Sequence, residues 1–135
     1  MRSVTATAYA RAGLLGNPSD IYGGRVLAFT FRNFSARVRV DPAEGIALGR
    51  EVATDAVRDA IAVGMAGGRG EGALLGAALK QLTDHAPELL ELPGSDTRVG
   101  FRVTVITDIP RQVGLAGSSA IVVATLRALA GWFGV

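Results

Sequence analysis

The chain contains no cysteine, so disulfide bonds and thiolate metal sites are both excluded. Residues 1–5 contain no apolar segment of the kind that forms the centre of a secretory signal peptide. No uninterrupted apolar run reaches the roughly 20 residues that a helix needs to cross a bilayer. From these absences we expect a cytoplasmic protein that does not bind membranes.

Charged residues of both signs are few, and they are spread evenly along the chain. The chain has 14 lysine and arginine residues against 12 acidic ones, which gives a net charge of only +2. The arginines are scattered, with no basic run and no aromatic residues interleaved among them. Nucleic-acid-binding surfaces cluster basic residues, so nucleic acid is not an expected partner.

Apolar residues, by contrast, make up 49% of the 135 residues, and the mean hydropathy of +0.33 is high for a lone domain. This length is sufficient for one domain with its own core. Two explanations of the apolar excess stay open. Further protein covers one face of the domain, or the composition is biased toward alanine, glycine and valine.

The spacing of apolar residues, with glycine and proline at the breaks, predicts the secondary structure. Strands are expected at residues 4–10, 26–31, 34–40, 45–49 and 99–107. The short link at Arg32 and Asn33 predicts a hairpin between the second and third of them. Helices are expected at residues 54–65, at 72–84 and from 120 onward, and a loop at 14–24.

Three details of this pattern concern the surface. Arg37 and Arg39 alternate with apolar residues and are expected on a solvent-exposed strand face. The single histidine, His85, falls at the end of the second helix, where a capping role is more probable than a catalytic one. The last helix is apolar almost all round, which is typical of a buried helix.

The most informative stretch is the loop at residues 109–120, which follows a strand and opens a helix. In that arrangement the free N–H groups of the turn and the positive end of the helix converge on one point, which favours an anion. Gly114 and Gly117 let the backbone curl, and Ser118 and Ser119 supply hydroxyl groups. The simpler interpretation is a serine N-cap with glycine as turn punctuation.

Two common phosphate loops fit this stretch poorly. A Walker A loop requires lysine before its serine or threonine, and residues 109–120 contain no lysine. A dinucleotide fingerprint requires an acidic residue about 20 positions after its glycines, and the sequence ends before that distance.

The run from Pro110 to Ala120 resembles the second motif of the GHMP kinases, a Pro-x-x-x-Gly-Leu-x-Ser-Ser-Ala loop that wraps the phosphates of ATP. Ala116 and Gly117 stand where the general motif has one residue, and the glucuronokinase-type members share this longer form.

The segment from Arg11 to Asp20 resembles the first motif of the same family, in which a basic residue leads into Leu-x-Gly-Glu-His-x-Asp. Here Asn17 and Pro18 replace the glutamate and histidine. This replacement argues against galactose, and Gly-Asn-Pro-Ser-Asp is the glucuronokinase-type form. The two motifs occur in the expected order and bracket most of the chain.

The resemblance implies a role for each matched residue. ATP would be bound by Pro110, Arg111, Gly114, Leu115, Ala116, Gly117, Ser118, Ser119 and Ala120. Ser119 would also face Mg²⁺, and Arg11 would be catalytic, near the transferred phosphate. The sugar substrate would be bound by Asn17, Ser19, Asp20 and Arg25.

The resemblance also leaves alternatives open at these residues. Arg25 and Arg111 are both candidates for a uronate carboxylate, since each lies beside a motif. Without the second motif, Asp20 would be read as an Asx turn and Arg11 as a surface strand end. For transfer to occur, the two loops must lie on the same side of the molecule.

At the level of the whole chain, the resemblance implies an α+β fold, ribosomal protein S5 domain 2-like, in which a mixed sheet carries helices on one face. Residues 1–135 would form a single GHMP kinase N-terminal domain, truncated, with a C-terminal domain absent. The implied activity is ATP-dependent phosphorylation of the anomeric hydroxyl of a sugar, D-glucuronate in first place. Because the family's catalytic aspartate and third motif would lie further along, we expect the isolated chain to be weak or inactive.

Two other functional classes stay open from the sequence. One is a non-catalytic nucleotide-binding module or paralogue, and the other is a domain that binds RNA, since the same layer occurs in translation proteins.

Overall fold

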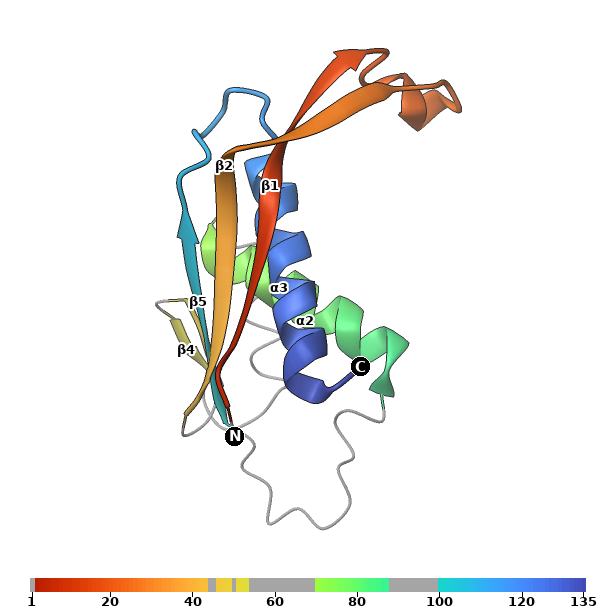
Figure 1. Ribbon diagram of the computed structural model, residues 1–135. Helices are drawn as coiled ribbons and strands as arrows, with labels where there is room; N and C mark the ends of the chain where they lie inside the picture. Colours follow the sequence, from red (N-terminus) through yellow and green to blue (C-terminus); the bar gives the residue numbers. More distant parts are fainter. Residues whose placement is uncertain (1, 44–45, 50, 54–69, 88–99) are drawn as a thin grey trace.

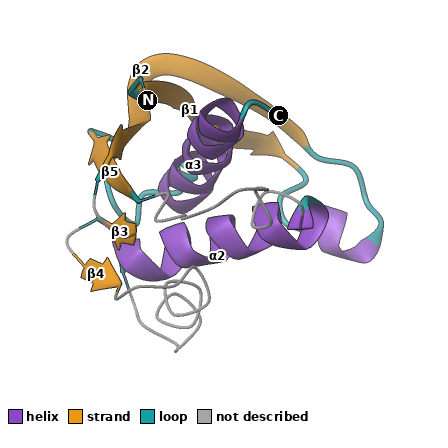
Figure 2. Ribbon diagram, turned by 90° about the horizontal axis from the view of Figure 1, so that it is seen from below, coloured by secondary structure: helices purple, strands orange, loops and turns teal. Residues whose placement is uncertain are grey.

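The computed structural model describes residues 2–43, 46–49, 51–53, 70–87 and 100–135. These residues form a five-stranded mixed sheet with strand order β1-β2-β5-β3-β4. The strands are β1 (Val4–Leu15), β2 (Leu27–Pro42), β3 (Ile46–Leu48), β4 (Glu51–Ala53) and β5 (Phe101–Thr107). Two helices, α2 (Glu71–His85) and α3 (Gly117–Phe133), lie on one face of the sheet (Figures 1 and 2). The predicted α+β fold is confirmed.

The long ribbon of β1 and β2 corrects the prediction of a hairpin at Arg32 and Asn33. β2 is one strand through those positions, and β1 pairs antiparallel with its whole length, up to Leu15 opposite Leu27. The pairing jumps from Tyr9 opposite Ser35 to the next β1 residue opposite Phe31, so residues 32–34 bulge out. This bulge interrupts the apolar alternation, which is why the sequence reads as two strands there.

The centre of the sheet is β5, between β2 and β3. It runs antiparallel to β2 and parallel to β3, whose three residues are all buried. β4 forms the far edge, antiparallel to β3. The predicted helix at residues 54–65, which follows β4, lies outside the described residues.

The outer face of the sheet carries charge, as the alternation predicted. Arg37 and Arg39 are exposed on β2, and the Nε of Arg39 lies 2.7 Å from Oδ1 of Asp41. The pKa of Asp41 is below its ordinary value, mainly because its carboxylate accepts a hydrogen bond from the Ser3 hydroxyl. The hydrogen bond from Arg39 lowers this pKa further. These contacts stabilise the beginning of β1 against the end of β2.

The helices stack on the inner face. α3 packs against β1 and β2, and α2 packs against α3 and touches β3. His85 is the last residue of α2, and its Nδ1 lies 2.9 Å from the carbonyl oxygen of Gln81. The histidine thus lies at the helix end, as predicted, while the C-cap itself is Ala86, so the capping role of His85 stays a prediction.

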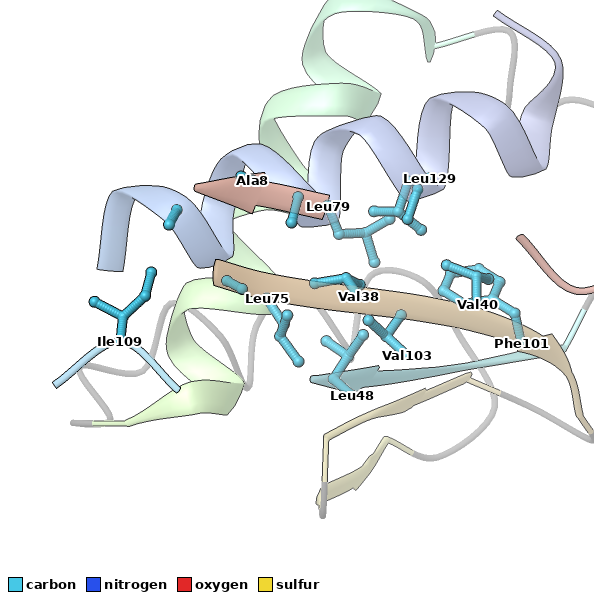
Figure 3. Packing of buried hydrophobic residues seen from close by; sticks show 14 of the residues in the cluster. Ala8, Val38, Val40, Leu48, Leu75, Leu79, Phe101, Val103, Ile109 and Leu129 are labelled. Atoms are coloured by element: carbon cyan, nitrogen blue, oxygen red, sulfur yellow. The ribbon is translucent and has the colours of Figure 1, made fainter. Parts of the chain in front are cut away.

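The core lies between the sheet and the two helices (Figure 3). Val38, Val40 and Val103 point inward from β2 and β5 and are fully buried. The helices contribute Leu75, Leu79 and Leu129, none of which is exposed. Phe101 is held between Trp132 and Phe133 of α3, at ring-centroid distances of 6.3 and 6.0 Å.

One side of α3 stays open, which the apolar pattern of this helix did not predict. Ser119, Val123 and Arg127 are exposed, and their spacing of four residues places them in one row along the helix. The buried positions, among them Ala124 and Ala128, occupy the opposite side. This open row lies next to β1 and forms one wall of the cleft described below.

Replacing Leu129 with alanine should destabilise the domain strongly. Deleting a fully buried leucine side chain costs about 2–5 kcal/mol. The matched control is Ile106→Ala, since that side chain is 69% exposed, and its cost should stay below about 1 kcal/mol. Urea unfolding of both variants measures the difference, and equal losses would contradict the core as described.

Candidate functional site

The glycine loop connects β5 to α3 and is anchored to β2. Asp108 accepts a hydrogen bond from the backbone N–H of Ser35 at 2.7 Å, and the Thr107 hydroxyl donates to the Ser35 carbonyl at 3.1 Å. Ile109 is buried beneath the loop, and a Cβ added at Gly117 would lie 3.4 Å from it. The loop is therefore fixed at its entry and at its exit.

Between these anchors the backbone turns back on itself. Three loop residues have left-handed conformations: Gln112 at φ 60°, Gly114 at φ 78° and Ala116 at φ 55°. Only Gly114 accepts this without steric cost. The turn is therefore strained at two positions and gives α3 an abrupt beginning.

Helix α3 begins at Gly117, three residues earlier than the predicted start at Ala120. Its N-cap is Ala116, which has no side-chain hydrogen bond to offer, so the serine N-cap interpretation is wrong. Ser118 and Ser119 lie inside the first turn, and both are exposed.

The start of α3 is suited to an anion. The first hydrogen bond of the helix runs from the N–H of Ala120 to the carbonyl of Ala116, so the N–H groups of residues 117–119 have no partner within the helix. The first turn contains no acidic residue to neutralise the helix dipole. Three backbone donors and two serine hydroxyls therefore surround a point of positive potential.

The first motif reaches this loop through β1. The backbone N–H of Arg11 donates a hydrogen bond of 3.2 Å to the carbonyl oxygen of Leu115. β1 is an edge strand, so this N–H is not needed by the sheet and can hold the loop. Figure 1 shows the glycine loop and the tip of the β1–β2 ribbon at the same end of the molecule.

A cleft of about 310 Å³ opens between the edge of β1 and the open side of α3. Four residues predicted from the motifs line it: Arg11, Ala116, Ser119 and Ala120. The other lining residues are Ala8, Tyr9, Thr30, Val123 and Arg127. The motifs do not predict this second group, because its members line the cleft only through the way α3 packs along β1.

The remaining residues of the glycine loop lie outside the cleft. Pro110, Arg111 and Gly114 are exposed and do not line the cleft, while Leu115 packs against the core. Gly117 and Ser118 are at the helix start, beside the cleft residue Ser119. The loop thus borders the cleft along one side only.

The predicted sugar-binding residues lie farther out. Residues 19–22 form a short 3-10 turn, η1 (Ser19–Tyr22), at the tip of the β1–β2 ribbon. The Ser19 hydroxyl donates to the carbonyl of Arg25 at 3.1 Å, and its own carbonyl accepts from Gly24 at 2.8 Å. A side chain at Gly24 would collide with Ser19, which explains the glycine there.

This tip is not part of the cleft. Asn17, Asp20 and Arg25 are exposed, and none of them lines the cleft with Arg11. Four residues of extended strand separate Arg11 from Leu15, a distance of about 13 Å. The assignment of the tip to sugar binding therefore stays a prediction of the sequence.

The protein side chains of the site provide few ligands for a metal ion. Among the described residues no group of three or more histidine, cysteine, aspartate or glutamate side chains could hold a metal. Ser119 is the hydroxyl-bearing residue of the helix start that lines the cleft, and in the part of the chain that the structure describes no carboxylate lines it. The described residues fit a magnesium ion only if phosphate oxygens and water supply most of its ligands.

Comparison with known proteins gives a consistent result. Residues 73–135 match the family model described as the GHMP kinases N terminal domain. Glucuronokinase 1 of Arabidopsis thaliana is 35% identical to this chain over 136 aligned residues, which cover 94% of the chain. This chain belongs to the GHMP kinases. It corresponds to their N-terminal portion and is glucuronokinase-like.

Other relatives agree with this assignment. Probable glucuronokinase 2 of the same plant is also 35% identical, over 94% of the chain. The chain spans only 36% of the length of each of these two relatives. No helix in the described part of this GHMP kinase chain is long and apolar enough to cross a membrane.

Solved structures support the fold. The chain superposes on the mevalonate kinase of Methanococcus jannaschii with a TM-score of 0.74 at 16% identity, covering 98% of this chain and 41% of that one. A second mevalonate kinase structure gives a TM-score of 0.72, also at 16% identity, covering 96% of this chain and 40% of that one. The predicted fold of the GHMP kinase N-terminal domain is thereby confirmed.

The same substitution at two neighbouring alanines should have opposite effects on stability. Ala116→Gly relieves a left-handed alanine, so the free energy of unfolding should rise by a few tenths to about 1 kcal/mol. Ala120 is buried inside the helix, where glycine is less favourable than alanine. Ala120→Gly should therefore lower the free energy of unfolding by about 1 kcal/mol. Urea unfolding measures both, and losses of equal size would show that Ala116 is helical.

Proposed function

We propose that this domain is the phosphate-binding part of an ATP-dependent sugar kinase, and that D-glucuronate, phosphorylated at its anomeric hydroxyl, is the acceptor. One observation supports the proposal: the Arg11–Leu115 hydrogen bond joins the arginine of the first motif to the loop of the second, and Arg11 lines one cleft together with Ala116, Ser119 and Ala120. The 35% identity to proteins named glucuronokinases supports the choice of sugar.

The polyphosphate would bind at the beginning of α3. The three free N–H groups of residues 117–119 can donate to phosphate oxygens, and no acidic side chain of the first turn repels them. The left-handed turn at Gly114 leaves open space around it, so a phosphate could approach the backbone closely. Arg111 is exposed beside the turn and could add one positive charge.

Arg11 would act where the phosphoryl group is transferred. Its backbone is fixed to the loop, and Arg11 and Ser119 both line the cleft. A guanidinium there would stabilise the negative charge that develops on the phosphoryl oxygens. Magnesium bound to ATP would neutralise phosphate charge, and the hydroxyl of Ser119 is the side-chain ligand available for it.

The acceptor would enter the cleft from the side of β1. Orientation of the acceptor beside the phosphates would supply most of the rate acceleration, because the transfer needs little covalent chemistry from the protein. We retain the sequence-based proposal that Asn17, Ser19 and Asp20 contact sugar hydroxyls. This requires the tip of the ribbon to approach the acceptor.

The activity proposed is that of the whole protein in which this domain occurs. The curated relatives are about three times as long as the part that this chain covers, which is 36%. We propose that a C-terminal domain supplies further catalytic groups, so that residues 1–135 alone are weakly active or inactive.

Arg11→Gln should abolish most of the kinase activity of the full-length gene product. Loss of a charge that stabilises the transition state lowers kcat by about 100-fold, while ATP affinity changes little because the loop is held by the Arg11 backbone. Glucuronate-dependent release of ADP provides the measurement. The control is Arg37→Gln, an exposed arginine on the outer face of the sheet.

Two results would contradict the proposal. If the full-length product releases no ADP in the presence of D-glucuronate, the acceptor or the reaction is wrong. If it binds ATP in calorimetry but transfers phosphate to no sugar, the domain is a nucleotide-binding module instead.

A further inference from the structure

Arg127 lies in the cleft, although neither motif contains it. It is the only charged residue of α3, and it follows Ser119 and Val123 along the open row of the helix. Eight residues of helix separate Arg127 from Ser119, so the two positions are about 12 Å apart along the helix axis. The phosphate end and the arginine end of the cleft are therefore distinct.

The guanidinium of Arg127 is held in place by the edge of β1. Its Nη1 donates a hydrogen bond of 3.1 Å to the carbonyl oxygen of Thr7. That single bond uses one of the five N–H groups of the side chain and leaves the others for a ligand. None of the ion pairs among the described residues involves Arg127.

The lining of the cleft is positive at both ends, and none of the described residues that form it is acidic. Arg11 marks the end near the glycine loop, and Arg127 marks the other. Two hydroxyl-bearing residues belong to the same lining: Tyr9, between Thr7 and Arg11 on β1, and Thr30, which pairs with Arg11 on β2. Such a lining suits a phosphate at the Arg11 end and, beside it, a hydroxyl-bearing ligand whose anionic group lies at the Arg127 end.

The free edge of β1 adds main-chain donors and acceptors to this middle section. The edge-facing groups of Thr7 and Arg11 already bond to Arg127 and Leu115. Because alternate residues of a strand face the same edge, the N–H and C=O of Tyr9 also face the cleft. They are placed to bind sugar hydroxyls without any contribution from the tip of the ribbon.

We propose that Arg127 binds the carboxylate of the acceptor and makes the site specific for an acidic sugar. This inference rests on the proposed kinase function and names a residue for its substrate specificity. A planar guanidinium that is already oriented by one backbone bond suits bidentate binding of a carboxylate. The sequence-based candidates, Arg25 and Arg111, are exposed outside the cleft.

The test compares D-glucuronate with D-glucuronamide, its neutral near-isostere, in the full-length gene product. For the natural sequence, kcat/KM should be at least about 10-fold higher with the acid. Arg127→Gln should lower kcat/KM for the acid by about 10- to 100-fold, through KM, and leave the amide within about 2-fold. Arg127→Lys, which keeps the charge, should restore part of the preference.

The ratio of kcat/KM for the acid to kcat/KM for the amide distinguishes carboxylate binding by Arg127 from a purely structural role. If Arg127 only attaches α3 to β1, its loss lowers both activities alike and leaves the ratio unchanged, and the proposal is overturned. Arg25→Gln tests the competing assignment, in which Arg25 binds the carboxylate. If the ratio of kcat/KM for the acid to that for the amide falls in this variant and not in Arg127→Gln, the proposal is also overturned. Arg37→Gln, on the outer face, controls for the loss of any surface arginine.

Equilibrium binding of the two sugars tests the role of Arg127 independently of the proposed kinase activity. If neither sugar is phosphorylated, the kinase proposal fails, and calorimetry with both sugars still decides the role of Arg127. Tighter binding of the acid by the natural sequence, lost in Arg127→Gln while its thermal unfolding is unchanged, supports the proposal. Absence of glucuronate binding to the natural sequence overturns it.

Discussion

The hydrogen bond from Arg11 to Leu115 is the constraint on which the site depends. It joins the outer edge of β1 to the turn that precedes α3, two segments about a hundred residues apart in the chain. The bond fixes the backbone of the first motif's arginine beside the turn that carries the free N–H groups of the second motif. The bond is possible because β1 ends the sheet and has unpaired backbone groups on that side.

An exposed strand edge usually has to be protected from pairing with another chain. Here two backbone groups on the edge of β1 bond to other parts of the same domain. Leu115 occupies the N–H of Arg11, and Arg127 occupies the carbonyl of Thr7. The two residues of β1 next to Thr7, Ala8 and Tyr9, line the cleft. The same feature that needs protection thus supplies the binding surface.

The sequence predicted the parts of this site that depend on local patterns. The strand, the glycine loop and the following helix were placed in the right order because each has its own periodicity or turn residues. The start of α3 was missed because its N-cap is Ala116, which has none of the side-chain oxygens that usually mark a helix start. The unbroken β2 was missed because its bulge at residues 32–34 has the composition of a turn.

The role of Arg127 could not be predicted from the sequence for a different reason. Its position on an apolar helix indicates only a charged residue on the solvent side. That this side faces the edge of β1 follows from the packing of α3 across the sheet, which no local pattern encodes. For the same reason, the sequence grouped Asn17 and Asp20 with Arg11, although the ribbon carries them beyond the cleft.

The central claim, one phosphate site shared by β1 and the beginning of α3, is tested most directly by an amide NMR titration with magnesium ATP. We predict that the amide signals of Arg11 and of residues 117–120 shift together along one binding curve, while those of η1 stay in place. Shifts confined to other parts of the domain, or a loop that responds while Arg11 does not, would contradict this account.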